Sequence, residues 1–389
     1  WDSGPAFISE FRLAFTSTRG GNTSTLVPGT TSSGKGTRIW AIDLDGRNAE
    51  LSSHHSLSQE QHPLLLQNGR LAYSSWQIFG TLPFRHTNGS PGGFTTLANL
   101  FHIYAQDPDG AGNFPIYGQH SGDHFPSWFG EDHSAAHFLA QTSDGRIWLT
   151  DYYRRNNFGL GSLIGLMQEP AGQEGINPHE ASHRADSYAP RDAIKFSNWA
   201  HNGDSMSGVL LDPPVMHPAY TDPLLYSGKV GHPAALPGNQ LMLVWGKGAC
   251  SQNSSAGVFD ALGRERPPST SGFGQGTAMN VITSLNMDTP GCDTGIYIAT
   301  QVPSTHPNDL IEIVDSRQWH EIMPRAVVSY LELHGIERPE IIARADQRSD
   351  HPELALGEPF GLLGAASITD RETHPRGGIT FQGEKQFNQ

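Results

Sequence analysis

The sequence feature that most constrains the fold is a strand-and-turn unit that recurs along the first half of the chain. Its three copies end at Gly46, Gly110 and Gly172, which are 64 and 62 positions apart. In each copy a strand-like stretch leads into a turn, which reads Asp-x-Asp-Gly in the first two copies and Glu-Pro-Ala-Gly in the third. A fixed period of this length indicates units that lie side by side, because one small sheet cannot cover both of its faces alone.

The copy over residues 62–117 is the best defined and reads as four short antiparallel strands. An Asn68-Gly69 pair favours the positive φ angles that a tight hairpin turn needs. Further strands are expected at 71–76, 100–106 and 114–117. Four short antiparallel strands in roughly 55 residues have the size of one blade of a β-propeller. The sequence therefore predicts an all-β propeller with four-stranded antiparallel blades.

The length of 389 residues fits six such blades, or seven shorter ones. The first four blades are expected over 1–55, 56–119, 120–178 and 179–229, of which the last is the least regular.

A His232-Pro233 pair copies His62-Pro63 and opens the expected fifth blade. Strands at 295–300 and 309–315 are assigned to a sixth. Residues 1–323 therefore form the blades. Residues 324–389 form a C-terminal segment that is expected to close the ring and to pack on the propeller.

The charge and hydropathy of the chain disfavour three kinds of partner. The net charge of −14 argues against nucleic-acid binding, which needs a surplus of Lys and Arg, and against docking on anionic lipid. The sequence contains no run of 18 apolar residues, so it predicts no membrane insertion. Trp1 is not a natural first residue, and we expect that a signal peptide or another N-terminal segment precedes it.

Cys250 and Cys292 are the two cysteines of the chain. Neither belongs to a CxxC or CxxCH motif, so the sequence encodes neither a four-thiolate zinc site nor a covalently attached c-type haem. We interpret the pair as a disulfide that joins the fifth and sixth blades. The alternative is two separate buried thiols.

The densest group of candidate metal ligands consists of His124, His133 and His137. Two histidines four positions apart would point the same way on a helix, but the surrounding pattern is of strands and loops. The sequence therefore allows for a non-covalent metal ion at these three residues, and an ordinary polar loop is the alternative.

Tyr152, Tyr153, Arg154 and Arg155 combine aromatic and basic side chains at the expected end of a strand. Loops at strand ends form the binding face in this class of fold. We expect these four residues to bind a partner; the alternative is a packed tyrosine pair beside solvated arginines.

Two sets of motifs carry a family resemblance. The His-Pro opening and the Asn/Asp-Gly turns resemble the TolB-like (WD40-like) β-propeller repeat. The stretches 151–159, 295–298 and 358–364 resemble the propeller domain of the hydrazine synthase alpha-subunit family. That resemblance implies an exported protein in a multi-subunit redox assembly with c-type haems. This chain departs from the family because it lacks CxxCH.

From these observations we predict a periplasmic or extracellular β-propeller that acts as a binding or scaffold module. Its expected partners are the proteins of a larger assembly, which can include c-type cytochromes. The alternative is an enzyme, either a redox subunit of the hydrazine synthase type or a metal-dependent propeller hydrolase or lyase.

Overall fold

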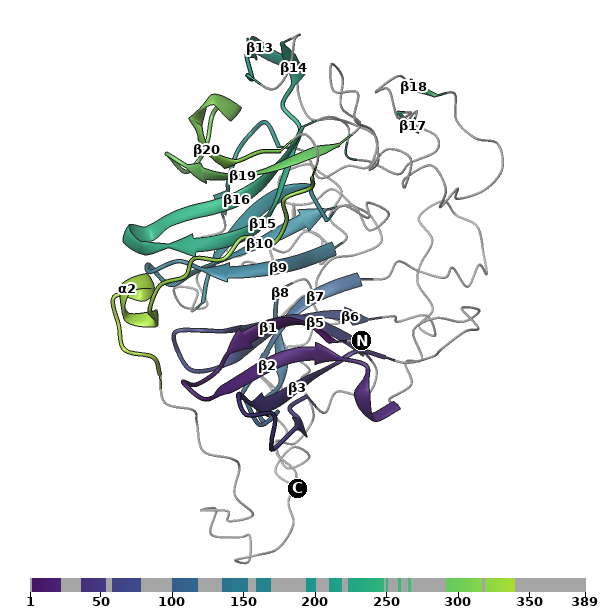
Figure 1. Cartoon of the computed structure of the whole chain (residues 1–389), viewed down its shortest axis with the longest axis vertical. Helices are drawn as coiled ribbons and strands as arrows, with labels where there is room; N and C mark the ends of the chain where they lie inside the picture. Colours follow the sequence, from purple (N-terminus) through teal and green to yellow (C-terminus); the bar gives the residue numbers. More distant parts are fainter. Residues whose placement is uncertain are drawn as a thin grey trace, which may run out of the picture.

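A computed structural model of the chain is shown in Figure 1. It describes residues 2–21, 36–53, 58–77, 100–117, 135–152, 159–168, 194–200, 210–218, 223–247, 250, 258–259, 265–266, 292–316 and 319–339. The one α-helix of these described residues is the single turn α2 (Tyr330–His334). Three 3₁₀ turns accompany the strands: η1 (Arg19–Gly21), η3 (Pro237–Asn239) and η4 (Pro307–Asp309). The all-β prediction is confirmed for this part of the chain.

Four four-stranded antiparallel units carry the fold, and we call them sheets I to IV. Sheet I comprises β1 (Asp2–Phe7), β2 (Arg12–Ser17), β3 (Arg38–Asp43) and β4 (Glu50–Leu51). Sheet II comprises β5 (Ser58–Leu65), β6 (Leu71–Gln77), β7 (Leu100–Gln106) and β8 (Phe114–Tyr117). Sheet III comprises β9 (Ala135–Gln141), β10 (Arg146–Tyr152), β11 (Ser162–Met167) and β12 (Ile194–Lys195). Sheet IV comprises β15 (Lys229–Leu236), β16 (Gln240–Lys247), β19 (Asp293–Ala299) and β20 (Leu310–Val314).

The four sheets pack in chain order, as the fan of strands from β1 to β20 in Figure 1 shows. The first strand of each sheet is its inner strand: β5 lies against β1 and β9, and β9 lies against β15. Apolar side chains fill the space between neighbours. Ile147 and Leu149 of sheet III pack toward Ile103 of sheet II, whereas Trp148 packs toward Leu243 of sheet IV. This alternation along β10 is what a strand buried on both faces requires.

Sheets II and III touch at one further point, where Phe101 of β7 and Ala135 of β9 form a single parallel pair. Among the described residues no strand pairing joins sheet IV to sheet I. The predicted number of blades and the closure of the ring therefore stay predictions. The sequence offers three segments for closing the ring. The segment 326–333 is described and runs into the helix α2 rather than a strand, and the segments 359–368 and 379–381 lie outside the described residues.

The prediction of separate fifth and sixth blades is wrong. β16 and β19 pair directly, from Met242 with Ile298 to Lys247 with Asp293, so both belong to sheet IV. The long connection over residues 248–292, which includes the short hairpin of β17 (Val258–Phe259) and β18 (Glu265–Arg266), separates the two strands along the chain. Most connections within a blade are short. A prediction that uses only local sequence patterns therefore places a boundary between two blades in a connection of this length.

The described residues of the expected fourth blade, 194–200, 210–218 and 223–229, do not form one four-stranded sheet. β12 adds to β11 at the outer edge of sheet III. The remaining described strands of this range are β13 (Leu210–Val215) and β14 (Leu224–Tyr226), which form a two-stranded hairpin, and the start of β15 at Lys229. Apolar residues of the hairpin, Leu211 and Val215 among them, join the core between sheets III and IV.

Each inner strand carries a β-bulge at the same place. In all four sheets, three steps along the inner strand match two steps along the second strand, which is the definition of a bulge. The residue in the middle of each bulge has a positive φ angle, 58° at Gly4, 55° at His62, 52° at Phe138 and 47° at His232. The repeated His-Pro pair thus marks the bulge rather than the opening of the strand.

Candidate functional site

The four bulge residues form a row across the inner strands, which we call the inner row: Gly4, His62, Phe138 and His232. A Cβ atom placed on Gly4 would lie 3.8 Å from the Cα atom of His62. The ring centroids of His62 and Phe138 are 4.3 Å apart, and those of Phe138 and His232 are 4.0 Å apart. Positive φ angles at non-glycine residues are strained and persist only where the surroundings enforce them. The packing of all four sheets therefore holds the residues of the inner row in this backbone conformation.

His137 adds a third imidazole to this row. Its Nδ1 atom is 3.2 Å from Nδ1 of His62, so one of the two rings donates a hydrogen bond and the other accepts it. Its ring also lies 3.9 Å from that of Phe101 and 5.4 Å from that of Tyr152, measured between centroids. The side chain is buried, and its Nε2 atom has no hydrogen-bond partner within the described residues.

The environment keeps the imidazoles of His62 and His137 neutral. Burial, with help from the positive charge of Arg325, lowers the pKa of His62 to about 4. Burial, together with His62 and His232, lowers the pKa of His137 well below 6.5. A neutral imidazole offers one donor and one acceptor, so the row suits a neutral polar ligand or the relay of a proton.

The segment after sheet IV crosses the inner strands and covers this row. Met323 donates its backbone N–H to Nδ1 of His232 at 3.2 Å. On one side of this contact, Nδ1 of His320 lies 3.4 Å from Oγ1 of Thr294. On the other side, Nδ1 of His334 in α2 lies 3.2 Å from Nε2 of Gln67 in the β5–β6 turn. Figure 1 shows the segment running from β20 past β15 to α2.

The sequence-predicted site residues are only partly described by the structure. His137 and Tyr152 are described, and both lie beside the inner row. His124, His133, Tyr153, Arg154 and Arg155 lie outside the described residues. The predicted metal site and the predicted partner-binding group therefore stay predictions. His62 and His232 were not predicted as site residues, although the repeated His-Pro pair to which they belong is recognisable in the sequence.

A second polar site lies in sheet IV and centres on Lys247, the last residue of β16. We call it the lysine cluster; its other members are Asp293, Tyr297, Asp315, His217, Glu312 and Glu321. The Lys247 side chain is fully buried and forms an ion pair with the buried carboxylate of Asp315. Its Nζ atom also donates to the Tyr297 hydroxyl at 3.2 Å and lies 3.8 Å from Oδ2 of Asp293.

The local fold explains how these groups come together. Lys247 and Asp293 are opposite each other in the β16–β19 register, and Tyr297 is opposite Glu312 in the β19–β20 register. Gly295 leaves room for the Asp315 carboxyl group, because a Cβ atom at this position would lie 2.7 Å from its Cγ atom. A glycine in the middle of a strand often marks such a close approach.

Charge in the lysine cluster is held by pairing rather than removed. Burial lowers the pKa of Lys247 to about 8, although Asp293, Glu312 and Glu321 act in the opposite direction. Burial raises the pKa of Glu321. Sequence reasoning missed this site because its members are spread from residue 217 to residue 321 and no motif connects them.

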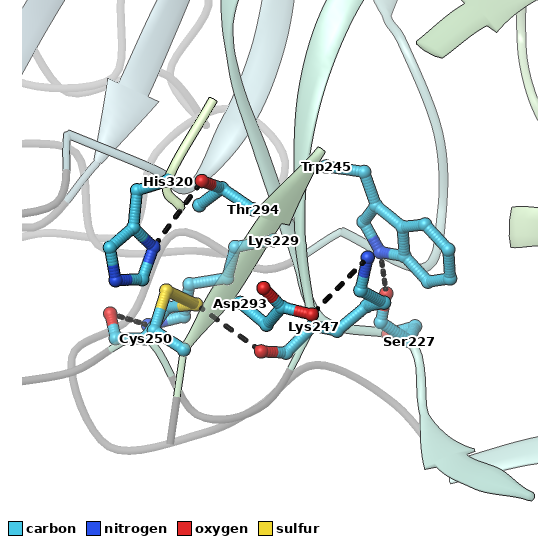
Figure 2. Close-up of a disulfide and its surroundings, with 9 residues drawn as sticks. Ser227, Lys229, Trp245, Lys247, Cys250, Asp293, Thr294 and His320 are labelled. Carbon is cyan, nitrogen blue, oxygen red and sulfur yellow. Dashed lines mark hydrogen bonds and ion pairs between the residues drawn. A yellow bond between two sulfur atoms is a disulfide. The ribbon is translucent and has the colours of Figure 1, made fainter. Parts of the chain in front are cut away.

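The predicted disulfide between Cys250 and Cys292 is present and lies beside the lysine cluster (Figure 2). It connects the end of β16 with the start of β19 and so lies within one sheet, not between two blades as predicted. Figure 2 also shows Lys229, a second buried lysine, whose Nζ atom lies 3.5 Å from the backbone oxygen of Cys250.

Comparisons with known proteins give only distant similarities. No protein-family model and no curated protein matches the chain. Among solved structures it is similar to a gluconolactonase from Xanthomonas campestris, with a TM-score of 0.31 and 14% identity over 64% of this chain and 57% of the other. It is similar to the PQQ-bound aldose sugar dehydrogenase from Streptomyces coelicolor, with a TM-score of 0.26 and 14% identity over 62% and 71%.

The third similar structure is the hydrazine synthase of Kuenenia stuttgartiensis, with a TM-score of 0.31 and 10% identity over 83% of this chain. The chain spans only 39% of that protein and 57% of the gluconolactonase. A hydrazine synthase is thus among the similar structures. TM-scores and identities this low say nothing about activity, substrate or partners.

Proposed function

We propose that the protein is an exported β-propeller that serves as a binding or scaffold module within a larger extracytoplasmic assembly. The observation that carries this proposal is a group of exposed apolar side chains on the outer edge of sheet IV and just after it. We call this group the apolar edge: Ile311, Ile313, Val314, Trp319 and Ile322. Their exposed fractions are 54%, 53%, 42%, 73% and 53%. A concentrated apolar surface of this kind marks a site of protein association.

The backbone of β20 supports the same proposal. Within the described residues β20 pairs only with β19, which leaves its other edge for a further strand. Proteins usually protect such an edge with lysine, proline or a bulge. β20 carries one charged residue, Glu312, and one register shift between Glu312 and Val314, so its regularly paired part is Leu310 to Glu312. An extended segment of a partner subunit can add to an edge strand and place its apolar side chains beside it.

Two findings are compatible with export. The chain contains a disulfide, and disulfides persist mainly in oxidising compartments outside the cytoplasm. None of the described helices has the length and apolar character of a membrane span.

The test is a comparison of wild-type protein with Ile313→Lys, purified from native extracts under mild conditions. We expect wild type to elute as an assembly with stoichiometric partners and Ile313→Lys to lose them. Phe11→Lys is the matched control, because Phe11 is 71% exposed but lies in the first sheet's β1–β2 turn. Haem absorbance of the co-eluting proteins tests the cytochrome part. A wild-type protein that elutes as a partner-free monomer contradicts the proposal.

The inner row favours a second candidate function, an enzyme with a histidine centre. Three imidazoles lie together there, two of them, those of His137 and His232, fully buried, and Nε2 of His137 has no partner in the described part of the chain. The test compares the metal and haem content of wild type and His137→Phe, both purified without chelators. Equal contents, whatever metal is bound elsewhere in the protein, would leave the binding module as the function.

A further inference from the structure

The lysine cluster contains an unusual surplus of negative charge for a buried site. Four carboxylates, those of Asp293, Asp315, Glu312 and Glu321, surround the single ammonium group of Lys247. The Asp315 side chain is 0% exposed and that of Asp293 is 5% exposed. A fully buried carboxylate such as that of Asp315 needs a cationic partner or a full set of hydrogen bonds.

Two carboxylate oxygens of the cluster also lack partners. Oδ1 of Asp315 and Oε2 of Glu321 are buried and have no hydrogen-bond partner among the described residues. Lys247 and Tyr297 both bond to Oδ2 of Asp315 and leave Oδ1 unused. An unsatisfied oxygen on a fully buried carboxylate is costly, and its presence indicates that a further positively charged group belongs there.

His217, which follows β13, lies against two of the four carboxylates. Its Nε2 atom lies 3.1 Å from Oε2 of Glu312 and 3.4 Å from Oδ2 of Asp315. One ligand atom from each of these three residues lies within 4.8 Å of the other two. The β13–β14 hairpin holds His217 in place, since Pro213 accepts a 2.9 Å hydrogen bond from the His306 side chain of sheet IV.

We propose that His217, Glu312 and Asp315 bind a divalent cation of the zinc class. One imidazole nitrogen and two carboxylate oxygens are a ligand set that Zn²⁺ accepts, whereas Mg²⁺ and Ca²⁺ prefer oxygen alone. Three protein ligands leave a coordination position for water or a ligand. Two positive charges would leave the cluster with one net negative charge. The Glu312 side chain, 43% exposed, gives the ion a path from solvent.

Lys247 takes a supporting position in this arrangement. Its ammonium group remains bonded to Tyr297 and near Asp293, and the Zn²⁺ ion shares the Asp315 carboxylate with it. Gly295 is needed for the same reason, because a methyl group there would displace the Asp315 carboxyl group. The proposal does not depend on the partner-binding function, because the three ligands belong to this chain and no partner residue is needed, although Glu312 lies on β20 between two residues of the apolar edge.

The experiment titrates the full-length, oxidised, metal-free protein with Zn²⁺ and measures the bound equivalents by calorimetry. Because the chain has 19 histidines, the informative quantity is the difference between variants. We expect Glu312→Gln and His217→Gln each to bind one equivalent fewer than wild type, or the same equivalent at least tenfold more weakly. Glu337→Gln is the control, since Glu337 is an exposed glutamate outside the cluster, and it should match wild type.

A second measurement keeps the test independent of folding. Glu312→Gln exchanges a half-exposed carboxylate for an amide of the same shape, so its circular dichroism should equal that of wild type. Co²⁺ substituted for Zn²⁺ should give visible absorption bands in wild type that are absent in a folded Glu312→Gln variant. Equal Zn²⁺ binding by wild type and Glu312→Gln overturns the proposal. So does equally tight binding of Mg²⁺, because it would assign the site to an oxygen-only ligand set.

Discussion

The inner row and the lysine cluster are two solutions to the same problem, which is how to bury titratable side chains inside a β-sheet protein. In the inner row, burial among aromatic rings keeps His62 and His137 neutral. In the lysine cluster, Lys247 forms an ion pair with Asp315 and lies 3.8 Å from Asp293, although burial lowers the pKa of the lysine. The difference teaches that the residue types present, not burial alone, decide whether a site loses its charge or pairs it.

The largest expected effect on stability comes from removing the ammonium group of Lys247 from the lysine cluster. Lys247→Met leaves the carboxylates of Asp315 and Asp293 without their partner, and breaking a buried pair in this way costs about 3–5 kcal/mol. Urea unfolding measures the loss. Arg47→Met is the control, because the Arg47 side chain is 82% exposed and its removal should have little effect. If Lys247→Met is as stable as wild type, the two sites do not differ in the way described.

The disulfide beside the lysine cluster gives the next largest effect. It joins residues separated by 42 positions, and such a cross-link stabilises by about 2–4 kcal/mol by restricting the unfolded chain. We expect Cys250→Ala combined with Cys292→Ala to lower the unfolding free energy by this amount. Because the inner row lies in other strands, the double variant should keep the acid sensitivity of wild type. A changed acid sensitivity would show that the two sites are coupled.

The neutral site predicts a specific dependence on pH. The pKa of His62 is about 4 in the folded chain and about 6.5 when unfolded, so below pH 6.5 the unfolded state binds the proton first. Stability is therefore complete above pH 6.5 and falls by about 1.4 kcal/mol per pH unit, for each such histidine, down to about pH 4. Denaturant unfolding at several pH values measures the slope.

His137→Phe sharpens that measurement. Phenylalanine suits the aromatic surroundings formed by Phe101 and Tyr152 and cannot take up a proton. The variant should lose one histidine's share of the acid slope while it keeps wild-type stability at pH 8 within about 1 kcal/mol. An unchanged slope would mean that His137 is protonated in the folded state, contrary to its assigned neutrality.

Local sequence signals predicted sheet II closely. The strands expected at 71–76, 100–106 and 114–117 correspond to β6, β7 and β8, because alternating residues and an Asn-Gly turn act over a few positions. The expected blades after residue 179 failed for the opposite reason. The pairing of β16 with β19 depends on residues that 248–292 separate, and no local pattern records such a partner.

The sites were less predictable than the strands. His137 was singled out for its spacing to His133, yet its described partner is His62, 75 positions away. Lys247 and Asp315 are 68 positions apart and belong to no motif. The one sequence signal for the inner row is the repeated His-Pro pair. Its histidines, His62 and His232, are the bulge residues of the inner strands β5 and β15.

The segment that follows sheet IV, residues 319–339, has a consequence for how the chain folds during synthesis. Residues 320–338 contact Thr294 and His232 of sheet IV, Gln67 of sheet II and Phe7 of sheet I. The last described stretch to leave the ribosome therefore packs on sheets that were synthesised earlier. Until it emerges, His232 lacks the backbone N–H that Met323 supplies. A nascent chain halted near residue 318 would therefore be without this hydrogen bond, and completion of the chain would form it in a single late step.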